Sequence, residues 1–378
     1  MTDAVLLVGD RVVIEAGHLQ NLLQALINTG FQLVGPIIRN GDLVYGELKT
    51  AADLPVGWTD DQESGTFRLK PRGDEAFFGF GVGQHSWRQY LLPSRCRLWH
   101  ARRDGNSFVI TSNRQEAFRY AFIGVHACDL QAIAIQDRIF LKGKYIEPSY
   151  REQRETLFIV AVNCTQAGGT CFCTSMGTGP KAVSGFDLAL TEILTTAKHC
   201  FLVEVGSGRG AGVLRNVPHT SATAEVQEQA ERLLQKTAAQ MGRQMDTVEI
   251  KELLYRNYEN PRWEEVGGRC LSCGNCTMVC PTCFCQAIED ITDLTGQEAE
   301  RWQRWDVCYT LDHSYIHGGS IRSSAMARYR QWLTHKLATW IDQFGCSGCV
   351  GCGRCITWCP AAIDITEEIN AIRKSDSA

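Results

Sequence analysis

Two cysteine runs constrain this chain more than any other feature of its sequence. The first run, which Pro281 follows, consists of Cys270, Cys273, Cys276 and Cys280. The second run, which Pro360 follows, repeats the spacing at Cys349, Cys352, Cys355 and Cys359. Thiolates at this spacing can surround one face of a metal cluster within a tight loop, and the proline then ends the loop. We therefore expect this part of the chain to fold around metal held by cysteine.

Each run has the form C-x2-C-x2-C-x3-C-P, which bacterial ferredoxins use to hold [4Fe–4S] clusters. In two-cluster ferredoxins, the fourth cysteine of each run ligates the other cluster. The spacing thus predicts a first cluster held by Cys270, Cys273, Cys276 and Cys359. It predicts a second cluster held by Cys349, Cys352, Cys355 and Cys280. A zinc site is the alternative, but zinc ribbons use pairs of C-x2-C rather than three cysteines in series.

Composition agrees with a globular metalloprotein. The 378 residues suggest two or three domains, and the formal net charge of −4 gives no indication of nucleic-acid binding. Eighteen cysteines in a chain without a recognisable signal peptide indicate metal ligands rather than disulfides. No apolar run approaches the roughly 18 residues of a membrane span. We expect a soluble, cytoplasmic protein that contacts neither nucleic acid nor membrane.

The hydrophobic pattern divides the chain into three regions. Residues 1–115 are rich in short strands, whereas residues 116–245 alternate between strands and helices and predict an α/β domain. Residues 246–378 are expected to form a helical domain that carries the two-cluster, ferredoxin-like module, with a long helical insertion at 286–345. The expected fold class is thus α+β or α/β, with a mixed N-terminal region and a helical C-terminal domain.

Glycine-rich segments in the first two regions give little sign of a nucleotide site. Residues 79–83 are expected to form a loop, because no clear helix follows them. Residues 206–211 partly match a dinucleotide fingerprint, but no helix is expected directly after them. Helical spacing instead predicts helices over 18–28 and 186–197. We expect no flavin or nicotinamide site in this chain.

Four further cysteines form a candidate third site. Cys128 and Cys164 each follow a predicted apolar strand, and parallel strands would bring them to the same edge of a sheet. Cys171 and Cys173 follow in one loop, where two glycines allow close backbone approach. The four thiols are expected to hold a third [4Fe–4S] cluster. The alternative is four ordinary buried thiols.

The remaining cysteines near the motifs have open roles. Cys283, Cys285 and Cys308 either hold another cluster or pack beside the first cluster and alter its potential through weak hydrogen bonds. Cys346 is spare, because a motif that began there would need a cysteine where the chain has Ile356.

The end of the insertion is expected to form a partner-docking helix. Apolar residues recur at helical spacing over 326–341, and Gly345 ends the helix. Basic charge at the rim of this face would come from Arg322, Arg328, Arg330 and Lys336. The alternative is a solvated basic face over an ordinary core.

With these motifs in view, the chain resembles the beta subunits of cytoplasmic bifunctional [NiFe] hydrogenases, the sulfhydrogenases. It is similar, more distantly, to the A subunits of anaerobic sulfite reductases. The matching segments are 128–130, 171–180, 269–285, 317–320, 327–332 and 348–360.

The resemblance implies an electron-transfer subunit without catalytic activity of its own. Such a subunit relays single electrons between a flavin subunit that uses NAD(P)H and the small subunit of the hydrogenase. The nickel–iron site lies in the large subunit, and this chain lacks the two separated C-x2-C pairs which that site needs. The alternatives are the corresponding subunit of a sulfite or sulfur reductase and an enzyme whose third cluster has an open coordination position.

Overall fold

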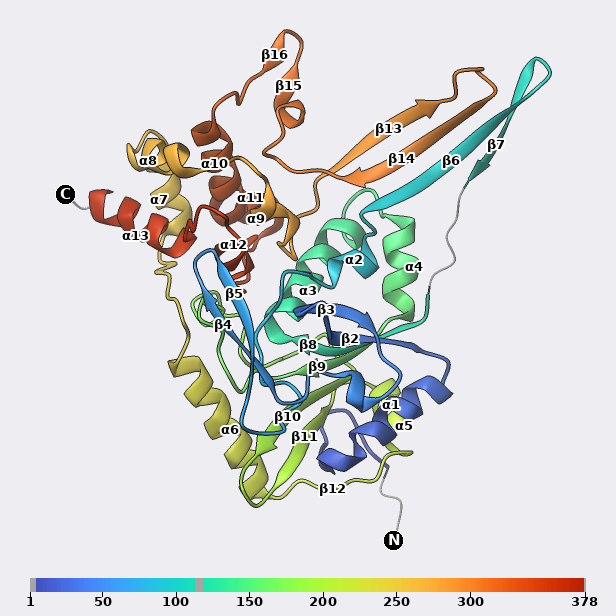
Figure 1. Cartoon of the computed structure of the whole chain (residues 1–378), viewed down its shortest axis with the longest axis vertical. Coiled ribbons are helices and arrows are strands. Elements are labelled where there is room, and N and C mark those ends of the chain that lie inside the picture. Colours follow the sequence, from blue (N-terminus) through green and yellow to red (C-terminus); the bar gives the residue numbers. More distant parts are fainter. Residues whose placement is uncertain (1–4, 113–117, 377–378) are drawn as a thin grey trace.

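An eight-stranded sheet forms the centre of the molecule. The computed structural model describes residues 5–112 and 118–376, and Figure 1 shows their arrangement. The strand order is β12-β1-β11-β10-β9-β8-β2-β3, and β2, β8, β9 and β10 run parallel to one another. The strands of this sheet are β1 (Arg11–Glu15), β2 (Gln32–Arg39), β3 (Asp42–Glu47), β8 (Tyr120–His126), β9 (Phe158–Val162), β10 (Leu188–Leu194), β11 (His199–Val205) and β12 (Thr220–Ser221).

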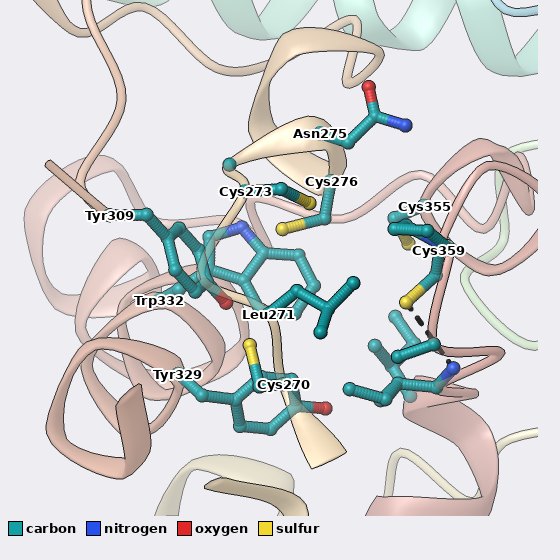
Figure 2. Close-up of a pocket in the computed structure, with 15 residues that line it drawn as sticks. Cys270, Leu271, Cys273, Asn275, Cys276, Tyr309, Tyr329, Trp332, Cys355 and Cys359 are labelled. Atoms are coloured by element: carbon teal, nitrogen blue, oxygen red, sulfur yellow. Dashed lines mark hydrogen bonds between the residues drawn. The ribbon is translucent and has the colours of Figure 1, made fainter. Parts of the chain in front are cut away.

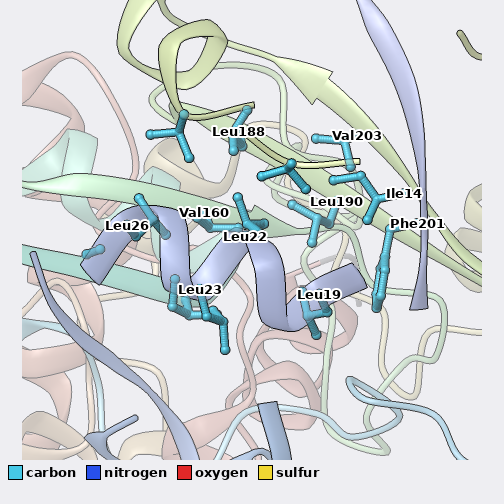
Figure 3. Close-up of a cluster of buried hydrophobic side chains, with 14 of the residues drawn as sticks. Ile14, Leu19, Leu22, Leu23, Leu26, Val160, Leu188, Leu190, Phe201 and Val203 are labelled. Atoms are coloured by element: carbon cyan, nitrogen blue, oxygen red, sulfur yellow. The ribbon is translucent and has the colours of Figure 1, made fainter. Parts of the chain in front are cut away.

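Helices cover both faces of this sheet. Alternate residues of β9 point to opposite faces: Val160 joins one apolar cluster, whereas Ile159 and Ala161 join another. The first face is covered by α1 (Leu19–Asn28) and α5 (Gly208–Leu214). The other face is covered by α3 (Ala127–Leu141), α4 (Pro148–Thr156) and α6 (Ala224–Ala239). Figure 3 shows the apolar stripe of α1 against the sheet, and the helix predicted over 18–28 is confirmed.

The helix predicted over 186–197 is wrong, because this segment forms β10. Its residues Leu188–Ile193 are all buried, and β10 pairs with β9 on one side and β11 on the other. The strand is buried on both faces and includes the buried polar residues Thr191 and Glu192, so its sequence lacks the alternation that would distinguish a strand from a buried helix.

The segment 206–211 also differs from expectation, because α5 begins within it at Gly208. The Ser207 hydroxyl accepts from the Gly210 amide and caps the helix, and it donates to the Asp187 carboxylate at 2.5 Å. A Cβ atom at Gly210 would lie 2.1 Å from the carbonyl oxygen of Asp187. This glycine therefore serves the close packing of helix and strand.

The eight-stranded sheet includes strands from both sides of the domain boundary expected between residues 115 and 116. The boundary residues themselves lie outside the described part of the chain. β2 pairs in parallel with β8, and β1 pairs antiparallel with β11. The strands β1, β2 and β3 therefore share a sheet with the strands of the α/β region. Pairing between strands so distant in the chain has no signature in the local hydrophobic pattern.

A second sheet projects from the body, as Figure 1 shows. Its order is β13-β14-β6-β7, with β6 (Arg95–Asp104), β7 (Ser107–Ser112), β13 (Gln286–Thr292) and β14 (Glu298–Trp305). The expectation of a helical insertion over 286–345 is therefore wrong in its first part, which is a hairpin paired with β6. Cross-strand contacts stabilise this pairing, including the ion pair between Arg97 and Glu300 and the stacking of Arg95 on Trp302.

The C-terminal region is mainly helical around the cysteine runs. Its helices are α7 (Ile250–Arg256), α8 (Arg262–Arg269), α9 (Asn275–Met278), α10 (Ala325–Thr334), α11 (Trp340–Phe344), α12 (Arg354–Thr357) and α13 (Ile365–Asp376), and a π-helical turn (His335–Thr339) joins α10 to α11. Glu368 of α13 is fully buried and accepts from Arg262 and Arg269 of α8, each at 2.6 Å. Further short elements include α2 (Arg88–Leu91) and the hairpins β4 (Trp58–Glu63) with β5 (Thr66–Pro71) and β15 (Tyr315–Ile316) with β16 (Gly319–Ser320).

A buried ion pair joins this helical region to the large sheet. The guanidinium of Arg354 in α12 binds both carboxylate oxygens of Asp129 in α3, at 2.9 and 3.0 Å. Its Nε donates to the carbonyl oxygen of Gly83 at 3.0 Å. Both side chains are almost completely buried. Because each charge is compensated by the other, the loss of one partner leaves the other uncompensated.

We expect Asp129→Asn to lower the free energy of unfolding by about 3–5 kcal/mol, because Arg354 then remains buried without a counter-charge. Glu228→Gln is the matched control, since its ion pair with Arg232 is exposed and should contribute about 0–1 kcal/mol. Anaerobic denaturant titration of the metal-loaded protein measures both changes. Equal effects of the two substitutions would contradict the prediction.

Candidate metal centres

The four cysteines expected to hold the first cluster line one pocket, shown in Figure 2. Cys270 directly follows α8, Cys276 lies in α9, and Cys359 follows α12. Left-handed backbone at Ser272 and Gly274 turns the first run back on itself. The structure thus brings the last cysteine of the second run beside the first three of the first run. Cys355, expected at the second cluster, also lines this pocket.

The walls of this first pocket suit an iron–sulfur cluster. They are largely apolar and aromatic, and include Leu271, Tyr309, Tyr329, Trp332, Ile363 and Ile365. Backbone amides of Ser272 and Ile363 donate to the sulfurs of Cys270 and Cys359 at 3.4 and 3.3 Å. Burial raises the pKa of the Cys276 thiol well above its ordinary value. A thiolate here needs a cationic partner, and iron would supply it.

The second group, Cys280, Cys349, Cys352 and Cys355, also lies together. Burial raises the pKa of the Cys355 thiol, and the nearby Cys349, Cys352 and Cys280 raise it further. The Gly351 amide donates to the sulfur of Cys349 at 3.4 Å. The crossed arrangement expected from the two runs is therefore compatible with the positions of all eight cysteines.

A lysine that the sequence pattern placed at a docking rim lies instead at this second group. Lys336 is 3% exposed, and its ammonium donates to the sulfur of Cys280 at 3.3 Å. Burial alone would lower the pKa of Lys336, but the thiols of Cys280, Cys283 and Cys349 raise it above its ordinary value. Lys336 lies three residues after Leu333 and four before Trp340, so helical spacing places it on the same buried face as these two residues.

Two arginines expected at the same rim are held by internal contacts. Arg328 donates to the carbonyl oxygen of Tyr309 at 2.9 Å, and Arg330 donates to that of Tyr258 at 2.7 Å. The Arg330 guanidinium also stacks on the Tyr258 ring at 3.8 Å. These groups brace α10 against its neighbours, so the basic rim expected on this helix is not present as predicted.

The four cysteines of the candidate third site meet at the carboxyl end of the parallel strands. β8 and β9 are parallel, as predicted, and Cys128 and Cys164 follow them. Burial raises the pKa of the Cys164 thiol, and nearby Cys173 and Cys171 raise it further. Cys128 and Cys173 share an apolar cluster with Cys352 of the second group. The predicted third site thus lies directly beside the second.

Close backbone packing joins the third group to the second cysteine run. The Phe172 amide donates to the carbonyl oxygen of Gly351 at 2.8 Å. Gly351 has φ +66°, and a Cβ atom there would lie 2.6 Å from the Phe172 carbonyl oxygen. The Phe172 side chain is buried, as predicted, but it packs into the apolar cluster of the helical region.

The remaining cysteines lie between and around these groups. A hydrogen bond between the thiols of Cys280 and Cys283 lowers the pKa of Cys280 and raises that of Cys283. Burial and nearby Cys285 raise the pKa of Cys308 to about 12. Cys346 packs against the apolar cluster that contains Cys352. Cys283 thus lies against the second group rather than beside the first.

Sequence reasoning missed the charged residues that surround these thiols. Arg88 is almost fully buried and donates to the carbonyl oxygens of Cys283 and Met278 at 2.6 and 2.9 Å. Arg88 is brought to the cysteines by tertiary contacts, and no local motif marks it. Arg354 lies inside the second run, but its buried partner Asp129 comes from a distant segment. These contacts follow only once α2, α3 and α12 are placed in the fold.

A single ion and a cluster make different demands on a site. Within residues 5–112 and 118–376, no group of three or more cysteine, histidine or acidic side chains is arranged to hold one metal ion. A cubane instead takes thiolates from the walls of a cavity, and the first pocket has this form. In the same described part of the chain, no helix combines the length and apolar character needed to cross a bilayer.

Comparisons with known proteins agree with these geometries. A family model described as a 4Fe-4S dicluster domain matches residues 269–363. Sulfhydrogenase 2 subunit beta from Pyrococcus furiosus is 32% identical over 259 residues, which cover 68% of this chain and 75% of that protein. This chain belongs to the sulfhydrogenase beta-subunit family. The resemblance inferred from the motifs is confirmed, and no solved structure gives a significant match.

The family model and the sulfhydrogenase relative indicate the chemistry of the C-terminal domain. It is an iron–sulfur domain that carries [4Fe–4S] clusters and serves electron transfer. The fold around it is mixed α/β, as the sequence predicted.

We expect Cys171→Ser and Cys173→Ser to lose about four iron atoms per chain, while the ferredoxin-type EPR signals persist, because these thiols lie at the candidate third cluster. Cys200→Ala is the matched control, since Cys200 is buried in β11 and packs in a different apolar cluster. Anaerobic iron and sulfide analysis provides the measurement. Unchanged iron in both serine variants would exclude the third cluster.

We expect Cys276→Ser to make the C-terminal domain sensitive to protease, because metal binding at buried thiols is coupled to folding. Limited proteolysis under anaerobic conditions, followed by mass spectrometry, locates the cleavage sites. The Cys200→Ala variant should remain as resistant as the parent. A Cys276→Ser protein that lacks iron but resists protease equally well would contradict the prediction.

Proposed function

We propose that this chain is the electron-transfer subunit of a cytoplasmic, NAD(P)-linked [NiFe] hydrogenase of the sulfhydrogenase type. It relays single electrons between a flavin subunit that binds NAD(P)H and the small subunit of the hydrogenase. The observation that carries this proposal is the contact between the three cysteine groups. Cys355 of the second group lines the first pocket, and Cys128 and Cys173 of the third group pack with Cys352.

These contacts support a continuous relay. Electron tunnelling weakens steeply with distance, so carriers held by groups in contact exchange electrons rapidly. We propose two [4Fe–4S] clusters in the dicluster domain and a third at the edge of the large sheet, with the ligands assigned from the sequence. The flavin, nicotinamide and nickel–iron sites are assigned to partner subunits.

The chain's own residues would adjust the carriers that they hold. When bound, the clusters supply one-electron carriers. Amide donors to Cys270, Cys349 and Cys359 would favour the more negative, reduced state. The aromatic side chains Tyr309, Tyr329 and Trp332 form one wall of the first pocket, whereas Cys273 is exposed.

We expect the tagged native protein, purified anaerobically, to bring with it flavin-containing and nickel-containing subunits and to support hydrogen-dependent reduction of NAD(P)+. The relative's name, sulfhydrogenase 2 subunit beta, motivates this expectation. Mass spectrometry and metal analysis identify the partners, and an untagged strain is the control. A sirohaem subunit in place of the nickel subunit would instead indicate a sulfite reductase.

A further inference from the structure

Lys336 is the buried cation that directly contacts the second cysteine group. Besides the sulfur of Cys280, its ammonium donates to the Thr282 hydroxyl at 3.0 Å and the Gly348 carbonyl oxygen at 3.1 Å. These three acceptors match the three donors of an ammonium. The Trp340 ring lies 5.1 Å away. The lysine is therefore held in one orientation, with one N–H directed at the sulfur.

The positive charge of Lys336 needs a negative partner. An ammonium taken out of water costs several kcal/mol unless it is compensated. Two of its three acceptors are neutral, so compensation comes from the sulfur of Cys280 and its neighbours. Arg354 also approaches this group, but Asp129 neutralises it. Arg88 is another buried cation near Cys280, but it donates to the carbonyl oxygens of Cys283 and Met278. Lys336 is thus the cation whose N–H is directed at the Cys280 sulfur.

The first pocket has no equivalent cation among the described residues that line it. Its lining consists of cysteine, aliphatic, aromatic, glycine and proline residues and Asn275. The two cysteine runs have the same spacing, so their ligand sets alone do not make the two clusters different. The surroundings of the two clusters differ, because the second cysteine group faces the Lys336 ammonium and the first faces apolar walls.

We propose that Lys336 is a positioning residue that raises the reduction potential of the second cluster above that of the first. The inference rests on the proposed function, in which Cys280 ligates the second cluster. Reduction adds one negative charge to a cluster, and a fixed positive charge and a hydrogen bond to the ligand sulfur both favour the reduced state. The second cluster is then the preferred electron acceptor of the pair.

The local fold retains contacts that do not involve Lys336. The Thr282 hydroxyl donates to the Gly348 carbonyl oxygen at 2.7 Å and lies 3.1 Å from the sulfur of Cys280. The segment that carries Cys280 is therefore tied to the second run independently of the lysine. An apolar replacement of similar length can test the charge of Lys336 while these contacts persist.

The test compares Lys336→Met, Lys336→Arg and the exposed control Lys374→Met in the full-length, iron-loaded chain. Anaerobic redox titration monitored by EPR measures the potential of each cluster. We expect Lys336→Met to lower the potential of one cluster and leave the other unchanged, while Lys336→Arg and Lys374→Met stay close to the parent. Unchanged potentials with full iron content would overturn the inference, as would an equal shift of both clusters.

A second comparison applies if Lys336→Met does not retain iron. Lys336→Gln and Lys336→Arg both keep hydrogen-bond donors, but only arginine keeps the charge. A lower potential in the glutamine variant alone supports the inference, and equal potentials in the two variants overturn it. Absence of [4Fe–4S] signals from the parent protein would instead contradict the proposed function, so the two failures are distinguishable.

Discussion

The buried ion pair between Arg354 and Asp129 fixes the position of the two cysteine-bearing parts of the molecule relative to each other. Asp129 follows Cys128 in the first turn of α3, and Arg354 lies between Cys352 and Cys355. Two-point binding by the guanidinium defines both distance and orientation, which an apolar contact alone would not do. Any sliding of α12 along α3 would separate buried charges. The placement of the third cysteine group beside the second depends on this pair.

A further set of buried polar contacts holds the loop of the third group from its other side. The Thr170 hydroxyl lies 2.7 Å from that of Thr357 in α12 and donates to Gln62 of β4 at 3.1 Å. Arg243 binds Asp364, which is fully buried, and donates to the carbonyl oxygen of Gly169 at 2.9 Å. Segments far apart in the chain thus converge on one loop. Because these polar groups satisfy one another, the arrangement is specific as well as stable.

Local chemistry is what the sequence predicts best in this protein. The ligands in Cys270–Cys280 and in Cys349–Cys359 lie within short loops, so their spacing can be recognised without knowledge of the fold. This spacing predicted the iron–sulfur motif and contributed to the family resemblance. The strand-end positions of Cys128 and Cys164 correctly predicted that these two cysteines lie at one sheet edge, because parallel strands end together. In contrast, β10 and the β13–β14 hairpin depend on partners distant in the chain. Lys336 was misplaced because its charge indicated an exposed rim, although its spacing from Leu333 and Trp340 places it on the buried face of the helix.

Identical spacing in the two cysteine runs does not make two equivalent sites. The first pocket surrounds its thiols with aromatic and aliphatic side chains, while the second has an arginine neutralised by a carboxylate and a lysine that faces sulfur. In the relay that we propose, such asymmetry would give an electron a preferred position between the two clusters. Here the asymmetry arises partly inside the second run, where Arg354 has the position of Asn275 in the first, and partly outside the motifs, from Lys336 and from Asp129 of α3. The ligand spacing therefore determines which cofactor the domain holds, whereas the surrounding fold determines how its two copies differ.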